Sequence, residues 1–254
     1  MNNILQVKEL NKIYTTSDGN AQHILKDVNL EIQEGEFVSV MGASGSGKST
    51  LLYNISGMDK MTSGSVNFCG MEIGELHEDE LSSLRLSMMG FIFQQSNLLK
   101  NLNIFDNIIL SAYQAKTESR QTINERASSL MEQMGILHLR SNDITQASGG
   151  QLQRATICRA LINKPQIIFG DEPTGALDSK ATEEVMKILT DINQSGTTIM
   201  LVTHDFKVAA KTERVLYMID GAIVGEYHLG KYRDGNEIKT RENQLSEWLS
   251  HMEQ

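Results

Sequence analysis

Alternating apolar and polar residues near the N-terminus predict two antiparallel strands. The alternation begins at Leu5 and resumes at Val28, with the period of two that a half-buried strand shows. The stretch between them is polar from 15 to 22 and contains Asp18-Gly19, a pair that favours tight turns. We therefore expect antiparallel strands joined by a polar loop or hairpin tip.

Three uninterrupted apolar runs predict buried parallel strands. They occupy 37–41, 167–170 and 198–202, and strands that are covered on both faces lack the alternation. A segment with the apolar spacing of a helix follows the first run at 49–56, and another follows the second run at 185–192. Buried strands that alternate with helices predict an α/β core around a parallel sheet.

No strand pattern occurs between about 97 and 164, where five apolar residues share one helical face. They are Ile123, Ala127, Leu130, Met131 and Met134. We interpret about 97–164 as a helical subdomain that is inserted into a domain spanning 1–224. The tail at 225–254 is polar until apolar residues recur around Leu245 and Trp248, which predicts an amphipathic helix that folds back onto the domain.

Charge and cysteine content narrow the functional classes. The net charge of −9 argues against broad binding to nucleic acid, which requires a basic face. Cys69 and Cys158 lack metal-site spacing and suggest reduced thiols. No apolar run approaches the roughly 20 residues of a membrane-spanning helix, and the start of the chain does not have the pattern of a signal peptide. We expect a cytoplasmic chain whose membrane role would come through a partner.

The clearest chemical signal is a glycine-rich loop between the first apolar run and its helix. Gly42, Gly47, Lys48 and Ser49 satisfy the pattern G-x-x-x-x-G-K-[ST]. Glycines let backbone N–H groups approach a phosphate, and the helix N-terminus adds partial positive charge. Lys48 would neutralise β- and γ-phosphate charge, and the Ser49 hydroxyl would bind Mg²⁺, so the loop predicts a nucleoside triphosphate site. Its residues are Gly42, Ala43, Ser44, Gly45, Ser46, Gly47, Lys48, Ser49 and Thr50.

A further strand is predicted at 90–93 and ends in Gln94 and Gln95. With it, polar side chains stand at the ends of three predicted strands, the others being 167–170 and 198–202, where open α/β sheets place their chemistry. Asp171 is suited to hold Mg²⁺, directly or through water, and Glu172 is suited to polarise the attacking water. Gln94 is either a plain strand-end residue or a ligand of Mg²⁺ or water. His204 would reach the γ-phosphate, although a lone histidine is more often structural.

Two further features stay open on the residues alone. Ser148, Gly149, Gly150 and Gln151 precede a helical stretch, where they form either a simple N-cap or a second anion site. Because one nucleotide rarely needs two phosphate-binding segments of the same chain, a second anion site would bind the nucleotide of another subunit. Tyr14 is either a strand-edge aromatic or a ring that stacks on adenine.

Taken together, these motifs resemble the ATP-binding subunit of an ABC transporter over nearly the whole chain. In that family they correspond to Walker A at 42–49, the Q-loop at Gln94, the signature at 148–151, Walker B with the catalytic glutamate at 167–172, the D-loop ending at Asp178, the switch histidine at His204 and the adenine-stacking aromatic at Tyr14. The resemblance implies an α/β, P-loop NTPase (RecA-like) core with an antiparallel β subdomain and an inserted helical subdomain. Ala147 stands where the family usually has leucine, a packing position, so we expect hydrolysis to survive.

The resemblance also implies a two-site mechanism. Two such domains would meet head to tail as a homodimer, with each ATP and its Mg²⁺ between the Walker A of one copy and the signature of the other. Ser148 and Gly150 would then act in trans on the γ-phosphate. ATP would close the dimer, hydrolysis would reopen it, and the helical subdomain would pass the motion to a membrane permease. The permease would hold the chain at the inner face of the cell membrane.

Within the family, 90–99 and 171–180 resemble the macrolide-exporter and lipoprotein-release branch. Within that branch, 40–48 and Ile168-Phe169 are most similar to bacitracin- and lantibiotic-resistance transporters, which implies resistance to antimicrobial peptides or their export. The alternatives are a lipoprotein or macrolide substrate, a soluble ABC ATPase of repair or translation, and an ATP-driven regulator of cell-wall hydrolases. The acidic charge disfavours nucleic acid as a partner, and the identity of the permease would separate the others.

Overall fold

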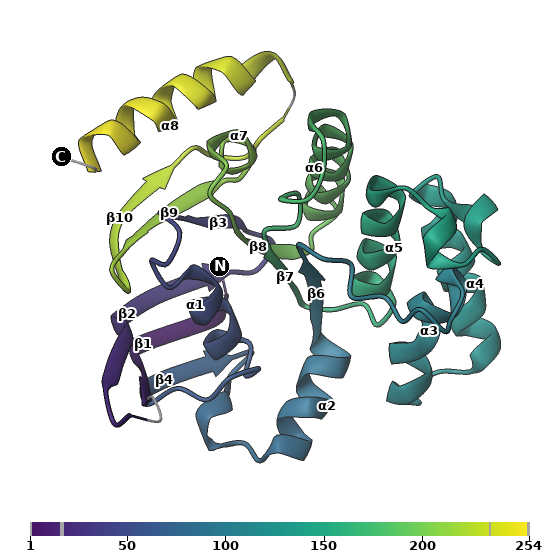
Figure 1. Cartoon of the computed structure of the whole chain (residues 1–254), viewed down its shortest axis with the longest axis horizontal. Helices are drawn as coiled ribbons and strands as arrows, with labels where there is room; N and C mark the ends of the chain where they lie inside the picture. The colour runs from purple at the N-terminus through teal and green to yellow at the C-terminus, as the bar shows by residue number, and fades with distance from the viewer. Residues whose placement is uncertain (1, 16–17, 234, 253–254) are drawn as a thin grey trace.

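The computed structural model describes residues 2–15, 18–233 and 235–252, and a six-stranded sheet runs through its centre (Figure 1). The strand order is β10-β9-β3-β8-β7-β6, and all neighbours are parallel except the hairpin of β9 and β10. The strands are β3 (Phe37–Met41), β6 (Met89–Phe93), β7 (Ile167–Asp171), β8 (Thr198–Val202), β9 (Arg214–Ile219) and β10 (Ala222–His228). Every residue of β3 and β8 is buried, which explains why these runs are apolar apart from Ser39 and Thr198.

A second, antiparallel sheet of order β2-β1-β4-β5 packs against one face of this core. Its strands are β1 (Asn3–Thr15), β2 (Ala21–Gln33), β4 (Ser63–Phe68) and β5 (Met71–Glu72). The helix α1 (Lys48–Ile55) lies between the two sheets, where Leu51, Leu52 and Ile55 are fully buried. The expected α/β core with an antiparallel sheet is thus confirmed.

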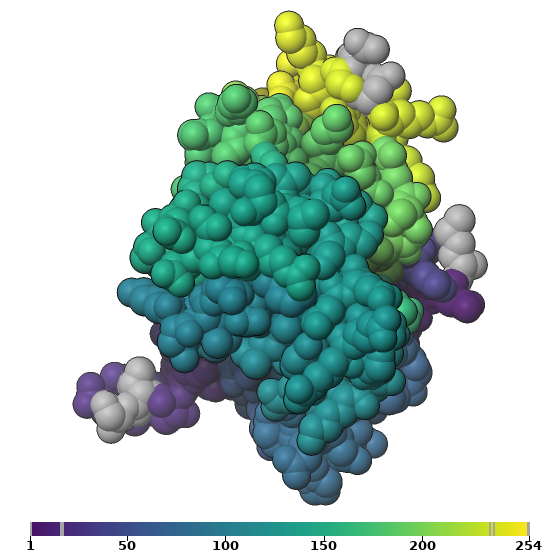
Figure 2. All heavy atoms as spheres, turned by 90° about the vertical axis from the view of Figure 1, so that its right-hand side faces the viewer, coloured from purple at the N-terminus to yellow at the C-terminus, as the bar shows by residue number. Residues whose placement is uncertain are grey.

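Helices cover the other face of the central sheet, because alternate strand residues point to opposite sides. In β8, Met200 belongs to the α1 side, whereas Ile199 and Leu201 pack against the helices. All regular elements between β6 and β7 are helical, namely α3 (Ile104–Ala115), α4 (Arg120–Gln133), α5 (Gly149–Leu161) and the short turns Leu137–Leu139 and Ile144–Gln146. This helical lobe occupies the centre of the face shown in Figure 2.

The remaining helices flank the sheets. They are Ile73–Glu75, α2 (Glu78–Met88), α6 (Ser179–Gln194), α7 (Phe206–Ala209), Gly235–Glu237 and α8 (Ile238–Met252). The C-terminal helix α8 lies against the β9–β10 hairpin, with Leu245 fully buried and the Trp248 ring edge-on to Tyr217. Its Arg241 guanidinium donates to four backbone carbonyls that end α7 and β10, those of Ala210, Thr212, Leu229 and Gly230. The tail therefore docks through both apolar and polar contacts.

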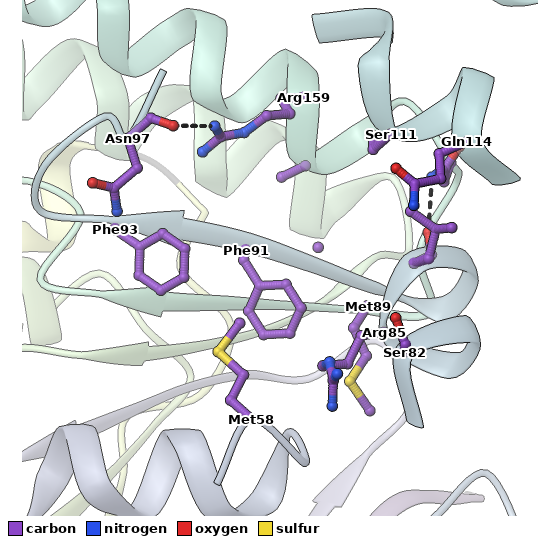
Figure 3. Close-up of a pocket in the computed structure, with 14 residues that line it drawn as sticks. Met58, Ser82, Arg85, Met89, Phe91, Phe93, Asn97, Ser111, Gln114 and Arg159 are labelled. Atoms are coloured by element: carbon purple, nitrogen blue, oxygen red, sulfur yellow. Dashed lines mark hydrogen bonds between the residues drawn. The ribbon is translucent and has the colours of Figure 1, made fainter. Parts of the chain in front are cut away.

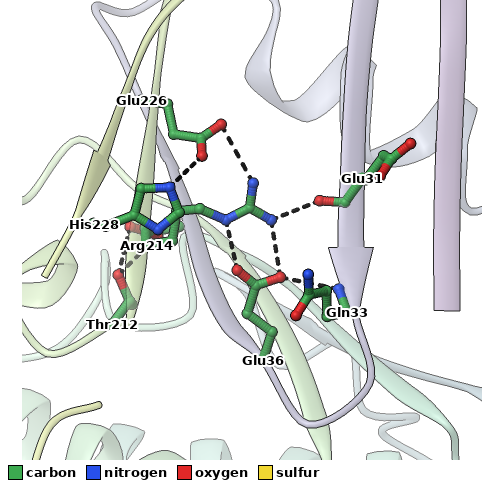
Figure 4. Close-up of polar contacts among 8 residues, drawn as sticks. Glu31, Gln33, Glu36, Thr212, Arg214, Glu226 and His228 are labelled. Atoms are coloured by element: carbon green, nitrogen blue, oxygen red, sulfur yellow. Dashed lines mark hydrogen bonds and ion pairs between the residues drawn. The ribbon is translucent and has the colours of Figure 1, made fainter. Parts of the chain in front are cut away.

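A largely buried ion pair fastens the antiparallel sheet to the edge of the core (Figure 4). The Arg214 guanidinium makes two bonds to the Glu36 carboxylate, at 2.5 and 2.8 Å, and donates to the Glu31 carbonyl at 2.6 Å. Glu226 lies on its other side, 3.4 Å from Arg214 Nη1, and pairs in turn with His228. These paired hydrogen bonds hold the start of β9 against the end of β2.

Candidate functional site

The glycine-rich loop joins β3 to α1, and its backbone requires glycine at two points. Gly47 is the N-cap of α1 with a φ of 100°, a left-handed conformation that side chains disfavour. At Gly42, a Cβ atom would lie 2.2 Å from the carbonyl oxygen of Met218, so no larger residue fits there. The loop thus leads into α1 without a side-chain cap in the described structure, which leaves the helix N-terminus open to an anion.

Two polar side chains of the loop are buried in ways that suit a phosphate ligand. Lys48 Nζ donates to the carbonyls of Gly42 and Ala43, each at 2.8 Å. Burial lowers the Lys48 pKa, and the carboxylates of Asp171 and Glu172 oppose that shift. The Ser46 hydroxyl is buried and has no hydrogen-bond partner among the described residues. A buried polar atom left in this state needs a partner, and a phosphate oxygen would supply one.

Asp171 ends β7 and faces α1 with both carboxylate oxygens engaged. Oδ1 accepts a hydrogen bond from the Ser49 hydroxyl at 2.8 Å, and Oδ2 accepts one from the Tyr53 hydroxyl at 2.7 Å. Burial and this hydrogen bond raise the pKa of Tyr53 to about 12, so the phenol is protonated at neutral pH. A hydroxyl and one carboxylate, completed by substrate phosphates, form the usual oxygen ligand set of Mg²⁺. These residues therefore fit a magnesium ion.

Glu172 and His204 meet at the neighbouring strand ends. Glu172 Oε1 lies 2.9 Å from His204 Nδ1, and the Glu172 N–H donates to the carbonyl of Val202 at the end of β8. Glu172 has a φ of +46°, an uncommon backbone state that the surrounding contacts must hold. In this conformation the Glu172 carboxylate contacts His204.

Gln94 approaches the same carboxylate around Gly175. A Cβ atom at Gly175 would lie 2.9 Å from Gln94 Nε2 and 3.2 Å from Glu172 Oε2, so a larger residue there would displace the ends of both side chains. The fold thus gathers Gln94, Asp171, Glu172 and His204 at one edge of the sheet, and the Ser49 hydroxyl joins them through Asp171. Residues that are 155 positions apart in the chain, from Ser49 to His204, meet there.

The segment 148–151 has different surroundings. Ser148 is the N-cap of α5: its hydroxyl accepts from the Gln151 N–H at 3.3 Å, and Gln151 Oε1 accepts from the Ser148 N–H at 2.8 Å. This capping box is the simple interpretation of the motif. Ser148 and Gly149 are exposed, and within the described ranges no hydrogen bond links 148–151 to 42–50. Asp178 similarly caps α6 by accepting from the Ala181 N–H.

Tyr14 lies on β1 with 41% of its surface exposed. Its hydroxyl donates to Asp59 at 2.5 Å, and Lys12 Nζ lies 4.5 Å from the centre of its ring. Burial of the hydroxyl, followed by the bond to Asp59, raises the pKa of Tyr14 to about 12. The ring is therefore held by two neighbours while a large part of it is accessible, which is compatible with both interpretations of this residue.

Sequence reasoning missed two residues of this site. Tyr53 lies in the helix expected at 49–56 without a predicted role, yet its hydroxyl donates to Asp171. Gln153 lies on α5 and is buried, with Nε2 donating to the carbonyls of Phe93 at 3.1 Å and Pro173 at 2.6 Å. It thereby ties the helix of the 148–151 segment to the neighbours of Gln94 and Glu172. The i to i+4 spacing from Ser49 to Tyr53 was the one available signal for the former.

A cavity of about 480 Å³ separates the core from the helical lobe (Figure 3). Phe91 and Phe93 of β6 and Met58 form its apolar wall, and Arg85 and Arg159 stand at its sides. Arg159 donates to the carbonyls of Ser96 and Asn97, just after Gln94, and its burial lowers its pKa. The cavity therefore borders the segment that directly follows Gln94. In the parts of the chain that the structure describes, no helix combines the length and apolar character needed to cross a bilayer.

Comparisons with known proteins agree on one kind of protein. Residues 25–175 match the family model described as ABC transporter. The chain is 45% identical over 224 residues to the macrolide export ATP-binding/permease protein MacB of Aggregatibacter actinomycetemcomitans, covering 88% of this chain and 34% of that protein. It is 41% identical over 228 residues to the bacitracin export ATP-binding protein BceA of Halalkalibacterium halodurans, covering 89% of each. The chain thus spans about a third of the length of the macrolide-export relatives.

Solved structures also resemble this chain, with sequence identities of 39% and 31% in two cases. A dimeric post-hydrolysis state of the ATP-binding cassette MJ0796, bound to ADP and Pi, matches with a TM-score of 0.83 and 39% identity, over 90% of this chain and all of that one. The cassette cbiO1 from Clostridium perfringens, part of the complex cbiONQ, matches with a TM-score of 0.79 and 31% identity, over 90% of this chain and 89% of that one. At 39% and 31% identity, these proteins resemble the chain in sequence as well as in fold.

Proposed function

The chain belongs to the ABC transporter family, as an ATP-binding cassette, and from this premise we propose that it hydrolyses Mg²⁺-ATP between two copies to drive a membrane permease. The observation that carries the proposal is the meeting of Glu172 with His204 beside the Ser49–Asp171 pair. A base, its orienting partner and a metal-ligand pair are the components that phosphoryl transfer to water needs.

Each residue of the proposed site has a separate role in ATP hydrolysis. The Glu172 carboxylate accepts a proton from a water whose oxygen attacks the γ-phosphorus, while the bond to the β-phosphate oxygen breaks and ADP leaves. His204, bonded to Glu172 through Nδ1, orients that carboxylate, and Gln94 holds the water or the metal from the other side. Lys48 neutralises the β- and γ-phosphates. Ser49 and Asp171 would hold Mg²⁺, which would supply further neutralisation of phosphate charge when bound.

A second copy completes the site. Ser148 and Gly150 begin α5 at the exposed end of the helical lobe, and helix N-terminal N–H groups bind anions. Because no hydrogen bond among the described residues links this segment to the loop 42–50, its anion would be the nucleotide of a partner copy. The solved dimer of the similar cassette MJ0796 supports this arrangement. Asp178, the N-cap of α6, would be a further residue of this interface.

The permease would dock at the cavity between the core and the helical lobe. A partner helix with apolar residues and an acidic end fits the wall of Phe91 and Phe93 and the cations of Arg85 and Arg159. Arg159 also holds the carbonyls after Gln94, so this position would couple the permease to the catalytic edge. Such docking would keep the chain at the inner face of the cell membrane.

We infer that the permease handles an antimicrobial peptide of the bacitracin type. The stretches 40–48 and Ile168-Phe169 are most similar to bacitracin- and lantibiotic-resistance transporters, and a bacitracin export ATP-binding protein is 41% identical to this chain. The macrolide export protein of Aggregatibacter actinomycetemcomitans is 45% identical. A macrolide is therefore the second candidate substrate.

The proposal is tested by Mg²⁺-dependent ATP hydrolysis of the full chain and of Glu172→Gln. We expect turnover to fall by about 100-fold or more, because the amide cannot accept the water proton. Glu247→Gln, an exposed change on α8 whose carboxylate makes no catalytic contact, is the matched control and should retain wild-type turnover. Equal turnover of Glu172→Gln and the wild type would remove Glu172 from the role of base.

A further inference from the structure

The hydrogen bonds of Asp171 point to a role for Tyr53 that the sequence motifs leave unassigned. Tyr53 Oη donates to Asp171 Oδ2 at 2.7 Å, and Ser49 Oγ donates to Oδ1 at 2.8 Å. We propose that Tyr53 is a positioning residue that fixes the orientation of the Asp171 carboxylate toward the metal site. The inference rests on the proposed roles of Ser49 and Asp171 in holding Mg²⁺.

Both anchors of the carboxylate come from α1. Ser49 and Tyr53 are four residues apart in this helix, so their side chains lie on the same face. The packing of α1 between the two sheets fixes that face against the end of β7. The glycine-rich loop and its helix therefore supply the metal-ligating hydroxyl and also the group that orients the second metal-site residue.

One hydrogen bond alone would leave the carboxylate poorly defined. The terminal torsion of an aspartate is soft, so a single bond from Ser49 permits the plane of the carboxylate to turn. The second bond, to the other oxygen, fixes that plane. Each carboxylate oxygen has about two acceptor positions, so both oxygens keep capacity for a metal or a metal-bound water. If the Ser49 oxygen held the metal, its hydrogen bond to Asp171 could change, whereas the hydrogen bond from Tyr53 to Asp171 would be retained.

Tyr53 itself is held firmly. Its carbonyl accepts the N–H groups of Met58 and Asp59 at 2.8 and 3.0 Å, which close the end of α1. Its ring is half-buried and packs against the apolar cluster between the sheets. Its hydroxyl bonds to Asp171 and not to the loop carbonyls that surround Lys48. Loss of the hydroxyl should therefore weaken metal binding and leave the binding of metal-free nucleotide intact.

The experiment is a Mn²⁺ titration of the full chain, followed by electron paramagnetic resonance, in the presence of the non-hydrolysable analogue AMP-PNP. For Tyr53→Phe we expect Mn²⁺ to bind about tenfold more weakly, the lower end of the loss caused by removing an outer-shell partner of a metal ligand. AMP-PNP affinity without metal should not change. Tyr113→Phe, which removes a 2.8 Å hydrogen bond to Asn124 in the helical lobe, is the matched control and should bind Mn²⁺ as the wild type does.

The Asp171→Ala background separates the possible failures. If Tyr53 acts through Asp171, Tyr53→Phe should cause no further loss of Mn²⁺ affinity in that background. Equal Mn²⁺ affinity of Tyr53→Phe and the wild type, or an undiminished loss in the Asp171→Ala background, would overturn the positioning role while leaving the metal site standing. Unchanged Mn²⁺ affinity in Asp171→Ala itself would overturn the proposed metal site and this inference with it.

Discussion

The phosphate loop at 42–50 and the segment 148–151 are both small-residue stretches that open a helix, but their surroundings differ. The loop is enclosed by its own chain: Lys48 and Ser46 are buried, and Ser49 is bonded to Asp171. The other segment exposes Ser148 and Gly149, and its side-chain hydrogen bonds, among the described residues, stay within its own helix end. One half of the proposed site is thus organised within the chain, whereas the other half is exposed and, under the proposal, would be completed by a second copy.

The largest expected effects come from substitutions in the two halves, which should differ in whether ATP binding is lost together with hydrolysis. Lys48→Ala should weaken ATP binding and abolish hydrolysis, because it removes the buried cation of the loop. Ser148→Arg should lower hydrolysis by about 100-fold, as the loss of one transition-state donor does, and leave the ATP affinity of the single chain unchanged. Calorimetric ATP titration and a turnover assay measure the two effects.

A matched control for Ser148→Arg is Ser119→Ala. Ser119 is the N-cap of α4 and accepts from the Thr122 N–H at 3.1 Å, so its loss costs about 1 kcal/mol of stability, as the loss of the Ser148 cap does. Normal turnover of Ser119→Ala would assign the effect of Ser148→Arg to the site. A loss of ATP affinity in the monomeric Ser148→Arg chain would contradict the division into two halves.

An intermediate effect is expected where the two regions are joined. Gln153→Leu should destabilise the chain by about 2 kcal/mol, because it leaves the buried carbonyls of Phe93 and Pro173 without their donor. Turnover should fall as well, since these carbonyls adjoin Gln94 and Glu172. Urea unfolding and a turnover assay measure both, and the exposed Gln133→Leu on α4 is the comparison variant. Normal stability of Gln153→Leu would show that the hydrogen bonds from Gln153 to Phe93 and Pro173 are not needed to join the two regions.

The smallest effect concerns Tyr14, for which two interpretations stay open. If its ring stacks on adenine, Tyr14→Ala should weaken ATP binding by about tenfold, and Tyr14→Phe should bind ATP almost normally because it keeps the ring. Tripolyphosphate, which has no base, should bind both variants as it binds the wild type. Undiminished ATP affinity of Tyr14→Ala would favour the strand-edge interpretation.

The sequence was sufficient to predict the fold class and the grouping of strand-end residues. Buried strands read as apolar runs, and the carboxyl ends of parallel strands meet at one edge, so Asp171, Glu172 and His204 could be expected together. The order of motifs also indicated the family, which the comparisons confirm. The nature of the transported substrate stays a proposal, because it depends on the permease.

Other parts of the site depend on tertiary contacts that no local pattern encodes. Gln153 reaches two carbonyls that are 60 and 20 residues away in the chain, and an amide in an amphipathic helix usually indicates an exposed face. The Arg214–Glu36 pair spans 178 residues. The left-handed backbone of Glu172 contradicts local preference, and such exceptions are expected where function sets the geometry.

The most direct test of the two-copy site is the molar mass of Glu172→Gln in Mg²⁺-ATP, measured by size-exclusion chromatography with light scattering. With hydrolysis blocked, ATP should hold two copies together, and the mass should be that of a dimer. Adding Ser148→Arg to the same chain should return it to a monomer that still binds ATP. A monomer in the first case despite bound ATP, or a dimer that is indifferent to Ser148→Arg, would contradict the account.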